Sequence, residues 1–146
     1  MMDMYDAKEI AKYIIYICNL NNISMTVSKL CKILYYAQGI MLTRADKQLF
    51  FNDIVAWKYG PCVPDVYYEY AYYGAEDIII MNLLSGDLPK LSSEAERLIL
   101  YIIMNTKDID FCYTIKSTTK SNSPWSKVEL NDIISPELIK QYFTWF

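Results

Sequence analysis

The segment from Leu30 to Gly74 constrains the fold of this chain more than any other part of the sequence. It begins with apolar residues at helical spacing, passes into a strand-forming run around Trp57, and is then interrupted by Gly60-Pro61. A tyrosine-rich stretch follows and ends at Gly74. Apolar residues spaced three and four apart favour helices, whereas β-branched and aromatic residues favour strands. The segment therefore predicts a helix, a small β element and a second helix, in that order.

The first of these helices is apolar on two sides. One face carries Leu30, Leu34, Ala37 and Met41, and another carries Ile33 and Ile40. A helix of this kind usually has neighbours packed on both sides. Thr26 is a suitable N-cap, because its side-chain oxygen can accept a hydrogen bond from the first helical turn. We therefore expect a central helix over residues 26–43.

Helical patterns occur at both ends of the chain as well. They predict helices over residues 6–19 and 108–119. A third helix is expected to begin at a cap at Ser93 and to contain the apolar run 98–104, and a last one to begin at Pro136 after a cap at Ser135. The predicted fold class is therefore mainly α, a compact helical domain with one small β-hairpin. Residues 1–146 are predicted to form one domain.

The β-hairpin is expected at about residues 49–59. Asn52-Asp53 interrupts the strand-forming run as a turn would, and Gly60-Pro61 is expected to end the hairpin. Pro64 suits the first turn of the following helix, and Gly74 suits its end. We expect Trp57, with Trp125 later in the chain, to be buried core anchors.

The absence of histidine excludes several kinds of enzyme. Ser-His-Asp and Cys-His catalysis both need an imidazole, as do most catalytic zinc sites. Four glycines and no phosphate-loop motif argue against a nucleotide site. Acid–base chemistry by two carboxylates, as in glycosidases, stays formally open, but the acidic residues fall at positions typical of turns, caps and solvent-facing helix faces. We expect no enzymatic activity, no cofactor and no metal.

The charge balance is slightly acidic. Fourteen Lys and Arg against seventeen Asp and Glu give a net charge of -3, and the local positive charge is limited to Lys116, Lys120 and Lys127. Binding to nucleic acid needs several cations arranged along one surface, so direct nucleic-acid binding is not expected. The start of the chain is acidic, unlike a signal peptide, and the run 98–104 is too short to cross a bilayer. These features predict a cytoplasmic protein with no membrane contact.

The four cysteines lie far apart in the sequence. Cys18, Cys31, Cys62 and Cys112 are separated by 13, 31 and 50 residues, and none form a C-x-x-C pair. Such spacing is not that of a zinc site or a redox motif. We expect four reduced thiols, most of them buried as small apolar side chains.

Tyrosine is the residue type in excess, with fourteen in the chain. Tyrosine supplies broad, rigid contact area, which is why protein interfaces favour it. In the stretch 67–73, Tyr68 and Tyr72 should point away from the core, and Tyr59 stands beside the Gly-Pro break. These side chains either lean over neighbouring loops or form a partner-binding surface. Trp145 and Phe146 at the C-terminus are either docked or a further partner contact.

Several short motifs occur in an order that resembles a known family. They are L-C-K-I-L-Y-Y-A-Q-G at 30–39, L-F at 49–50, A-W-K-Y-G-P at 56–61, V-P-D-V-Y at 63–67, P-W at 124–125 and I-K-Q-Y-F at 139–143. This order resembles the Panacea domain, the family of SocA-like antitoxins and phage-associated GepA-like proteins. The residues that carry the resemblance are Leu30, Leu34, Tyr35, Gln38, Gly39, Trp57, Gly60, Pro61, Pro64, Tyr67, Pro124 and Trp125. Lys120 stands where the family usually has histidine.

The resemblance implies an antitoxin that neutralises a co-encoded toxin by direct, stoichiometric contact. An aromatic, acidic surface would then cover the active or nucleic-acid-binding face of the toxin. Two alternatives remain open: a phage or prophage protein that inhibits a host defence or other host protein, and a proteolytic adaptor. The identity of the neighbouring reading frame would distinguish the antitoxin from the phage inhibitor.

Overall fold

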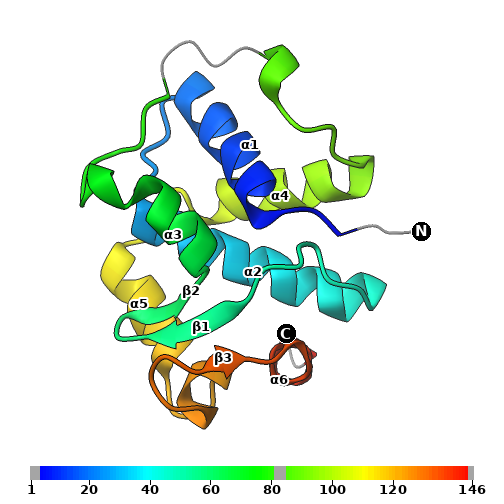
Figure 1. The fold of residues 1–146 in the computed structure, drawn as a ribbon, viewed down its shortest axis with the longest axis vertical. Coiled ribbons are helices and arrows are strands. Elements are labelled where there is room, and N and C mark those ends of the chain that lie inside the picture. Colours follow the sequence, from blue (N-terminus) through cyan, green and yellow to red (C-terminus); the bar gives the residue numbers. More distant parts are fainter. Residues whose placement is uncertain (1–3, 81–84, 145–146) are drawn as a thin grey trace.

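The computed structural model describes residues 4–80 and 85–144. Within these ranges the helices are α1 (Ala7–Leu20), α2 (Val27–Ala45), α3 (Pro64–Tyr70), α4 (Ser93–Thr106), α5 (Phe111–Thr119) and α6 (Pro136–Phe143). The strands β1 (Ile54–Trp57), β2 (Gly60–Cys62) and β3 (Ile133–Ile134) form an antiparallel sheet in the order β2-β1-β3. Short 3-10 helices are η1 (Ala71–Tyr73), η2 (Ser85–Asp87) and η3 (Pro124–Lys127). The fold is mainly α with a small β element (Figure 1), which confirms the predicted class.

α2 is the central helix, as its two-sided apolar pattern predicts. It packs against α1, α3, α4, α6 and β2. In Figure 1 it crosses the middle of the molecule, with α1 above it and the sheet and α6 below. Leu30 and Leu34 on this helix are completely buried, and each such leucine contributes about 1.5–3 kcal/mol to the stability of the fold. Thr26 caps α2, and its hydroxyl oxygen accepts a 3.2 Å hydrogen bond from the backbone N–H of Lys29.

Gln38 and Gly39 determine what packs against α2. The buried Gln38 donates from Nε2 to the carbonyl oxygen of Phe50 at 3.0 Å, and its Oε1 accepts from the backbone N–H groups of Leu49 at 2.7 Å and Phe50 at 3.3 Å. A Cβ atom at Gly39 would lie 2.6 Å from the ring of Phe143 in α6, so glycine is needed for this close approach. Both residues therefore have structural roles.

The β-hairpin is present, but its turn lies later in the chain than the predicted Asn52-Asp53. β1 and β2 pair with Trp57 opposite Gly60, so the turn consists of Lys58-Tyr59. Gly60-Pro61 does not end the hairpin, because both residues belong to β2. β2 is an edge strand of the sheet, where a proline without an N–H group is tolerated.

Asn52 connects two helices instead of forming the turn. Its buried side chain accepts a 2.7 Å hydrogen bond at Oδ1 from the backbone N–H of Ala7, the first residue of α1. Its Nδ2 donates at 2.8 Å to Oδ2 of Asp65 in the first turn of α3. Asparagine is common in turns, and this long-range use of its amide explains why the local pattern misplaced the hairpin.

Pro64 occupies the first position of α3, as predicted. α3 ends at Tyr70, before the predicted Gly74, because the chain continues in the tighter turns of η1 up to that glycine. Gly74 has a φ of +62°, a left-handed conformation that glycine adopts without steric cost. Ser135 and Pro136 begin α6 as the sequence predicts, with the serine hydroxyl accepting from the backbone N–H of Leu138.

α4 and α5 start at different residues than predicted. The cap of α4 is Ser92, one residue before Ser93, and α5 begins at Phe111, three residues after Asp108. α4 contains the apolar run 98–104 and buries only one side of it against the core. Among the described residues, no helix is both long enough and apolar enough to cross a bilayer.

Candidate functional site

A groove of about 420 Å³ lies where the β-hairpin, the start of α2 and α3 meet. Its aromatic wall consists of Trp57 from β1, Tyr59 from the turn, and Tyr67 and Tyr68 from α3. Its floor contains residues of α2 and β2, described below. Grooves that combine apolar ring surfaces with a few polar groups are the usual binding sites of proteins.

The rings of the aromatic wall pack edge to face. The ring centroid of Trp57 lies 5.1 Å from that of Tyr67 and 5.9 Å from that of Tyr68, and the two tyrosine centroids are 5.8 Å apart. These distances are typical of favourable aromatic pairs, which contribute about 0.5–1.5 kcal/mol each beyond the area they bury. The three rings therefore support one another as a preformed contact surface.

Trp57 differs from its predicted role as a buried core anchor. It is half-buried, and its ring packs on Tyr67 and Tyr68 at the groove. Trp125 in η3 is also half-buried, but it packs against the edge of the core. The indole N–H of Trp125 donates a 2.7 Å hydrogen bond to the carbonyl oxygen of Trp57. Trp125 thus fixes the backbone that carries the groove residue Trp57.

Two of the predicted partner-binding tyrosines meet at this groove. Tyr59 is 58% exposed and Tyr68 is 70% exposed, so both rings are available to a partner. Tyr72 is also exposed, as predicted, but its ring stacks on Tyr73 at 4.5 Å and lies outside the groove lining. Trp145 and Phe146 lie outside the described residues.

The floor of the groove brings together two cysteines that the sequence spacing did not connect. Sγ of Cys31 in α2 lies 2.8 Å from Sγ of Cys62 in β2, and both thiols are buried. The separation of 31 residues gave no signal for this pair, because it arises from the packing of β2 on α2. The four cysteines are free thiols and three of them are buried, as predicted, but the contact between Cys31 and Cys62 was not predicted.

Lys32 lies beside the thiol pair and is almost fully buried, with 4% of its surface exposed. Its Nζ donates to the carbonyl oxygen of Pro61 at 3.2 Å. A Cβ atom at Gly60 would lie 2.9 Å from Cε of Lys32 and 2.8 Å from Oγ1 of Thr118, and Gly60 has a φ of +119°. Glycine is thus required at position 60 both by its conformation and by the lysine packed against it.

The environment of the floor shifts the pKa values of its ionisable groups. The hydrogen bond from Cys62 lowers the pKa of Cys31, with further help from the backbone of Val63 and the charge of Lys32, and these effects outweigh burial. The pKa of Cys62 is raised, first by that same hydrogen bond and then by burial. Burial also lowers the pKa of Lys32, although the neighbouring thiols act in the opposite direction. Cys31 is therefore the thiol that ionises first.

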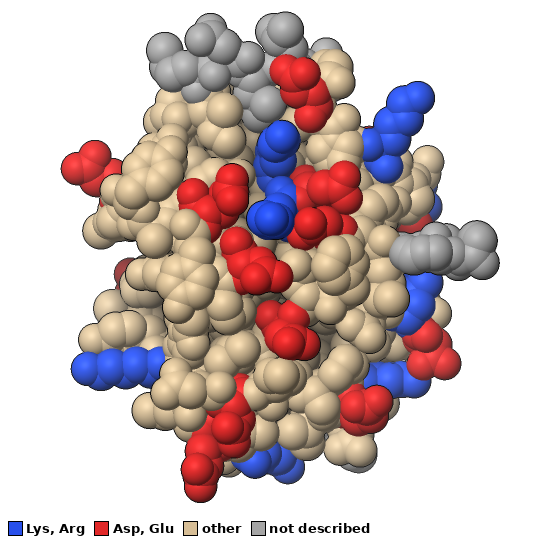
Figure 2. All heavy atoms as spheres, in the orientation of Figure 1, with Lys and Arg blue, Asp and Glu red and all other residues tan. Residues whose placement is uncertain are grey.

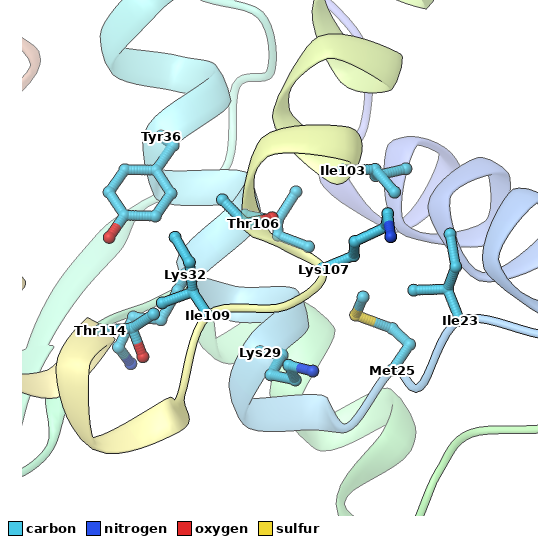
Figure 3. A pocket seen from close by; sticks show the side chains of 11 residues that line it. Ile23, Met25, Lys29, Lys32, Tyr36, Ile103, Thr106, Lys107, Ile109 and Thr114 are labelled. Atoms are coloured by element: carbon cyan, nitrogen blue, oxygen red, sulfur yellow. The ribbon is translucent and has the colours of Figure 1, made fainter.

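A second hollow lies on the other side of Lys32, between α2, α4 and α5 (Figure 3). It is lined mainly by apolar side chains, among them Met25, Ile33 and Ile103. Its volume is about 20 Å³, which is close to the space that a single water molecule occupies. It is too small for a ligand, so the groove is the better candidate site.

Acidic side chains line a further hollow, which shares helix α3 with the groove. Figure 2 shows them across the middle of one face, over α1 and α3, with basic side chains among them. A hollow of about 470 Å³ between these helices is lined by Lys8, Glu9, Lys12 and Glu69. α3 therefore contributes Tyr67 and Tyr68 to the groove, and Glu69 and Tyr70 to this charged hollow.

The remaining motif residues support the fold. Leu30, Leu34, Tyr35, Gln38, Gly39, Gly60, Pro61 and Pro124 are buried. Lys120, at the position where histidine was expected, is exposed directly after α5. Within the described part of the chain, no group of three or more His, Cys, Asp and Glu side chains is arranged as a metal site. The groove therefore offers ring faces, hydroxyl groups and a thiol pair.

Comparison with known proteins identifies the family. The family model described as antitoxin SocA-like, Panacea domain, matches residues 30–126, which is more than half of the chain. No curated protein and no solved structure matches the chain. The matched range runs from α2 to η3 and contains every residue that lines the groove except Ser28. The chain belongs to the family of SocA-like antitoxins with a Panacea domain.

Proposed function

We propose that this protein is an antitoxin that neutralises a co-encoded toxin by direct stoichiometric binding, and that the groove is its contact surface. The observation that carries the proposal is the aromatic wall of Trp57, Tyr59, Tyr67 and Tyr68 around a groove of about 420 Å³. The family supports an antitoxin role and, with it, a protein partner. We further propose that residues 1–146 act as one domain, because α1 and α6 both pack on α2.

Tyr59 and Tyr68 are the residues we expect to contact the toxin most directly. Exposed tyrosine and tryptophan side chains that surround a concave centre are typical hot spots of protein interfaces. Tyr68 is already held by the rings of Trp57 and Tyr67, so binding would cost little side-chain entropy. Lys58 lies with Nζ 5.3 Å from the ring centre of Tyr59 and adds a positive charge at the rim.

The mechanism would be occlusion, which requires no chemistry from this chain. A partner that inserts side chains between the hairpin and α3 would have its own active or nucleic-acid-binding face covered. The acidic side chains over α1 and α3 would favour a basic partner and increase the rate of association. This role is non-enzymatic, and it needs neither a cofactor nor direct contact with nucleic acid or membrane.

The test is co-expression with the product of the adjacent reading frame. Growth arrest by that product alone, rescue by this protein, and purification of a complex with a fixed ratio of subunits would support the proposal. Light scattering after size-exclusion chromatography gives the ratio. If no neighbouring product both arrests growth and is rescued, or if rescue occurs without a complex, then neutralisation by stoichiometric binding is wrong.

A further inference from the structure

We propose that Cys31 and Cys62 form an oxidation site, at which a peroxide converts the two thiols into a disulfide that joins α2 to β2. The site lies in the floor of the groove, and no part of the family assignment or of the proposed toxin binding depends on it. The inference therefore concerns the isolated protein and can be tested without a partner.

The geometry of the two sulfurs favours the bond. They are 2.8 Å apart, whereas the S–S bond of a disulfide is about 2.05 Å long, so the sulfurs need to approach by less than about 1 Å. α2 and β2 are already packed against each other, and the cysteines are held within these elements. The two sulfurs therefore need only a small shift to reach bonding distance.

The neighbourhood favours a thiolate at this position. Lys32 has 4% of its surface exposed, and the ionisable groups that act on it are the two thiols. A buried ammonium group is stabilised by a nearby anion, and a thiolate at Cys31 would supply one. Thiolates rather than thiols react with peroxides, and nearby lysine is a common feature of reactive cysteines. Lys32 acts here through its charge on Cys31 and does not itself react with the peroxide.

The groove gives a small oxidant access to the pair. Both cysteines line it, although their exposed surface is small. Hydrogen peroxide is only slightly larger than water, so we expect it to reach the small exposed surface of the pair through this groove. The remaining cysteines differ: Cys18 is buried away from this groove, and Cys112 is exposed on α5.

The reaction proceeds in two balanced steps. The Cys31 thiolate attacks one oxygen of hydrogen peroxide, the O–O bond breaks, and the leaving hydroxide takes up a proton to give water and a sulfenic acid. The sulfur of Cys62 then attacks the sulfenic sulfur, and the thiol proton leaves with the hydroxyl group as a second water. The two thiols lose two electrons and two protons in total, and the peroxide is reduced to two waters.

The experiment uses the folded full-length chain with Cys112→Ser, which removes the exposed thiol. After hydrogen peroxide treatment at neutral pH, we expect a mass loss of about 2 Da that dithiothreitol reverses, and a Cys31–Cys62 cross-link in the non-reducing peptide map. Cys18→Ser in the same background should behave identically. Cys31→Ser and Cys62→Ser should each lose the 2 Da change.

A further variant tests the role of Lys32. Lys32→Met keeps the length of the side chain and removes the charge, so the pKa of Cys31 should rise and the pH profile of the oxidation rate should shift to higher pH. At neutral pH the oxidation rate should fall about tenfold for each unit by which the pKa rises. Circular dichroism confirms that the variant is folded. The proposal is overturned if Cys31 and Cys62 both stay free after peroxide treatment, or if the cross-link involves Cys18. An unchanged pH profile for Lys32→Met would show that the charge of Lys32 does not promote the oxidation.

Discussion

The indole N–H of Trp125 donates a 2.7 Å hydrogen bond to the backbone carbonyl oxygen of Trp57, across 68 positions of sequence. This bond joins η3 to the last residue of β1. It therefore connects the stability of the C-terminal part of the fold to the aromatic wall of the groove. Both tryptophans belong to the motifs that carry the family resemblance. The ring of Trp57 forms part of the groove, whereas Trp125 fixes the backbone that carries it.

Trp125→Phe tests this connection. The substitution keeps an aromatic ring but removes the N–H donor, so the carbonyl oxygen of Trp57 loses its partner. We expect a loss of about 1–2 kcal/mol in the free energy of unfolding, measured by urea denaturation. Binding of a partner at the groove should weaken as well, because the position of the Trp57 ring is no longer fixed. A variant with an unchanged free energy of unfolding would show that this hydrogen bond does not stabilise the fold.

Gln38→Leu tests the role of the buried amide in α2. Three hydrogen bonds are lost, and the backbone N–H groups of Leu49 and Phe50 are left without this acceptor. We expect a destabilisation of about 2–4 kcal/mol, visible as a lower Tm. Gln48→Leu is the matched control, because Gln48 is only partly buried and donates one 3.2 Å hydrogen bond to the carbonyl of Phe50. Equal losses for the two variants would contradict the account.

Tyr35→Phe should stabilise the protein or leave it unchanged. The hydroxyl of Tyr35 is the buried side-chain polar atom that has no hydrogen-bond partner within the described residues. Its ring packs edge to face on Phe143 at 5.4 Å, and phenylalanine keeps that contact. Removal of an unpaired buried hydroxyl can therefore gain about 1 kcal/mol. A clear decrease in Tm would show that this hydroxyl has a partner.

The stability of the protein should fall between pH 9 and pH 11. Burial raises the pKa of Cys18 from 9.0 to about 11, while the charge of Lys29 acts in the opposite direction. Because the folded pKa is the higher one, the stabilisation is complete below the unfolded pKa and is lost as pH rises through the folded value. For Cys18 this amounts to about 2.7 kcal/mol. Urea denaturation at several pH values should give a shallower decline for Cys18→Ala, and an equal slope would contradict the assignment.

Much of the fold could be predicted from local patterns. The two-sided apolar pattern identified α2 as the central helix, and the residues Thr26, Pro64, Ser135 and Pro136 marked helix starts correctly. These signals are local because caps and first-turn prolines act within a few residues. The two-residue strand β3 was missed, since so short a strand exists only by pairing with β1.

The candidate site was predictable only in part. Exposure of Tyr68 follows from helix periodicity, and it is confirmed. Tyr59 is exposed because the turn consists of Lys58-Tyr59, whereas the sequence pattern placed the turn at Asn52-Asp53. The position of Tyr68 beside Trp57 depends on how α3 packs on the hairpin, which no local pattern determines. The pair Cys31 and Cys62 likewise depends on the packing of β2 on α2. Contacts between elements that are distant in the sequence therefore could not be predicted from local patterns.

The affinity of the Tyr59→Ala, Tyr68→Ala double variant for the adjacent gene product tests the central claim most directly. Both side chains are largely exposed, so the double variant should stay folded, with a loss of about 1–3 kcal/mol from the two ring contacts of Tyr68. If they are hot spots of the groove, isothermal titration calorimetry should give a Kd that is raised about 30-fold or more, equivalent to at least about 2 kcal/mol. Tyr72→Ala is the matched control, because Tyr72 is also exposed and lies outside the groove lining. Its Kd should stay within about threefold of the parent value. A folded double variant that binds as tightly as the parent would contradict the assignment of the groove as the partner site.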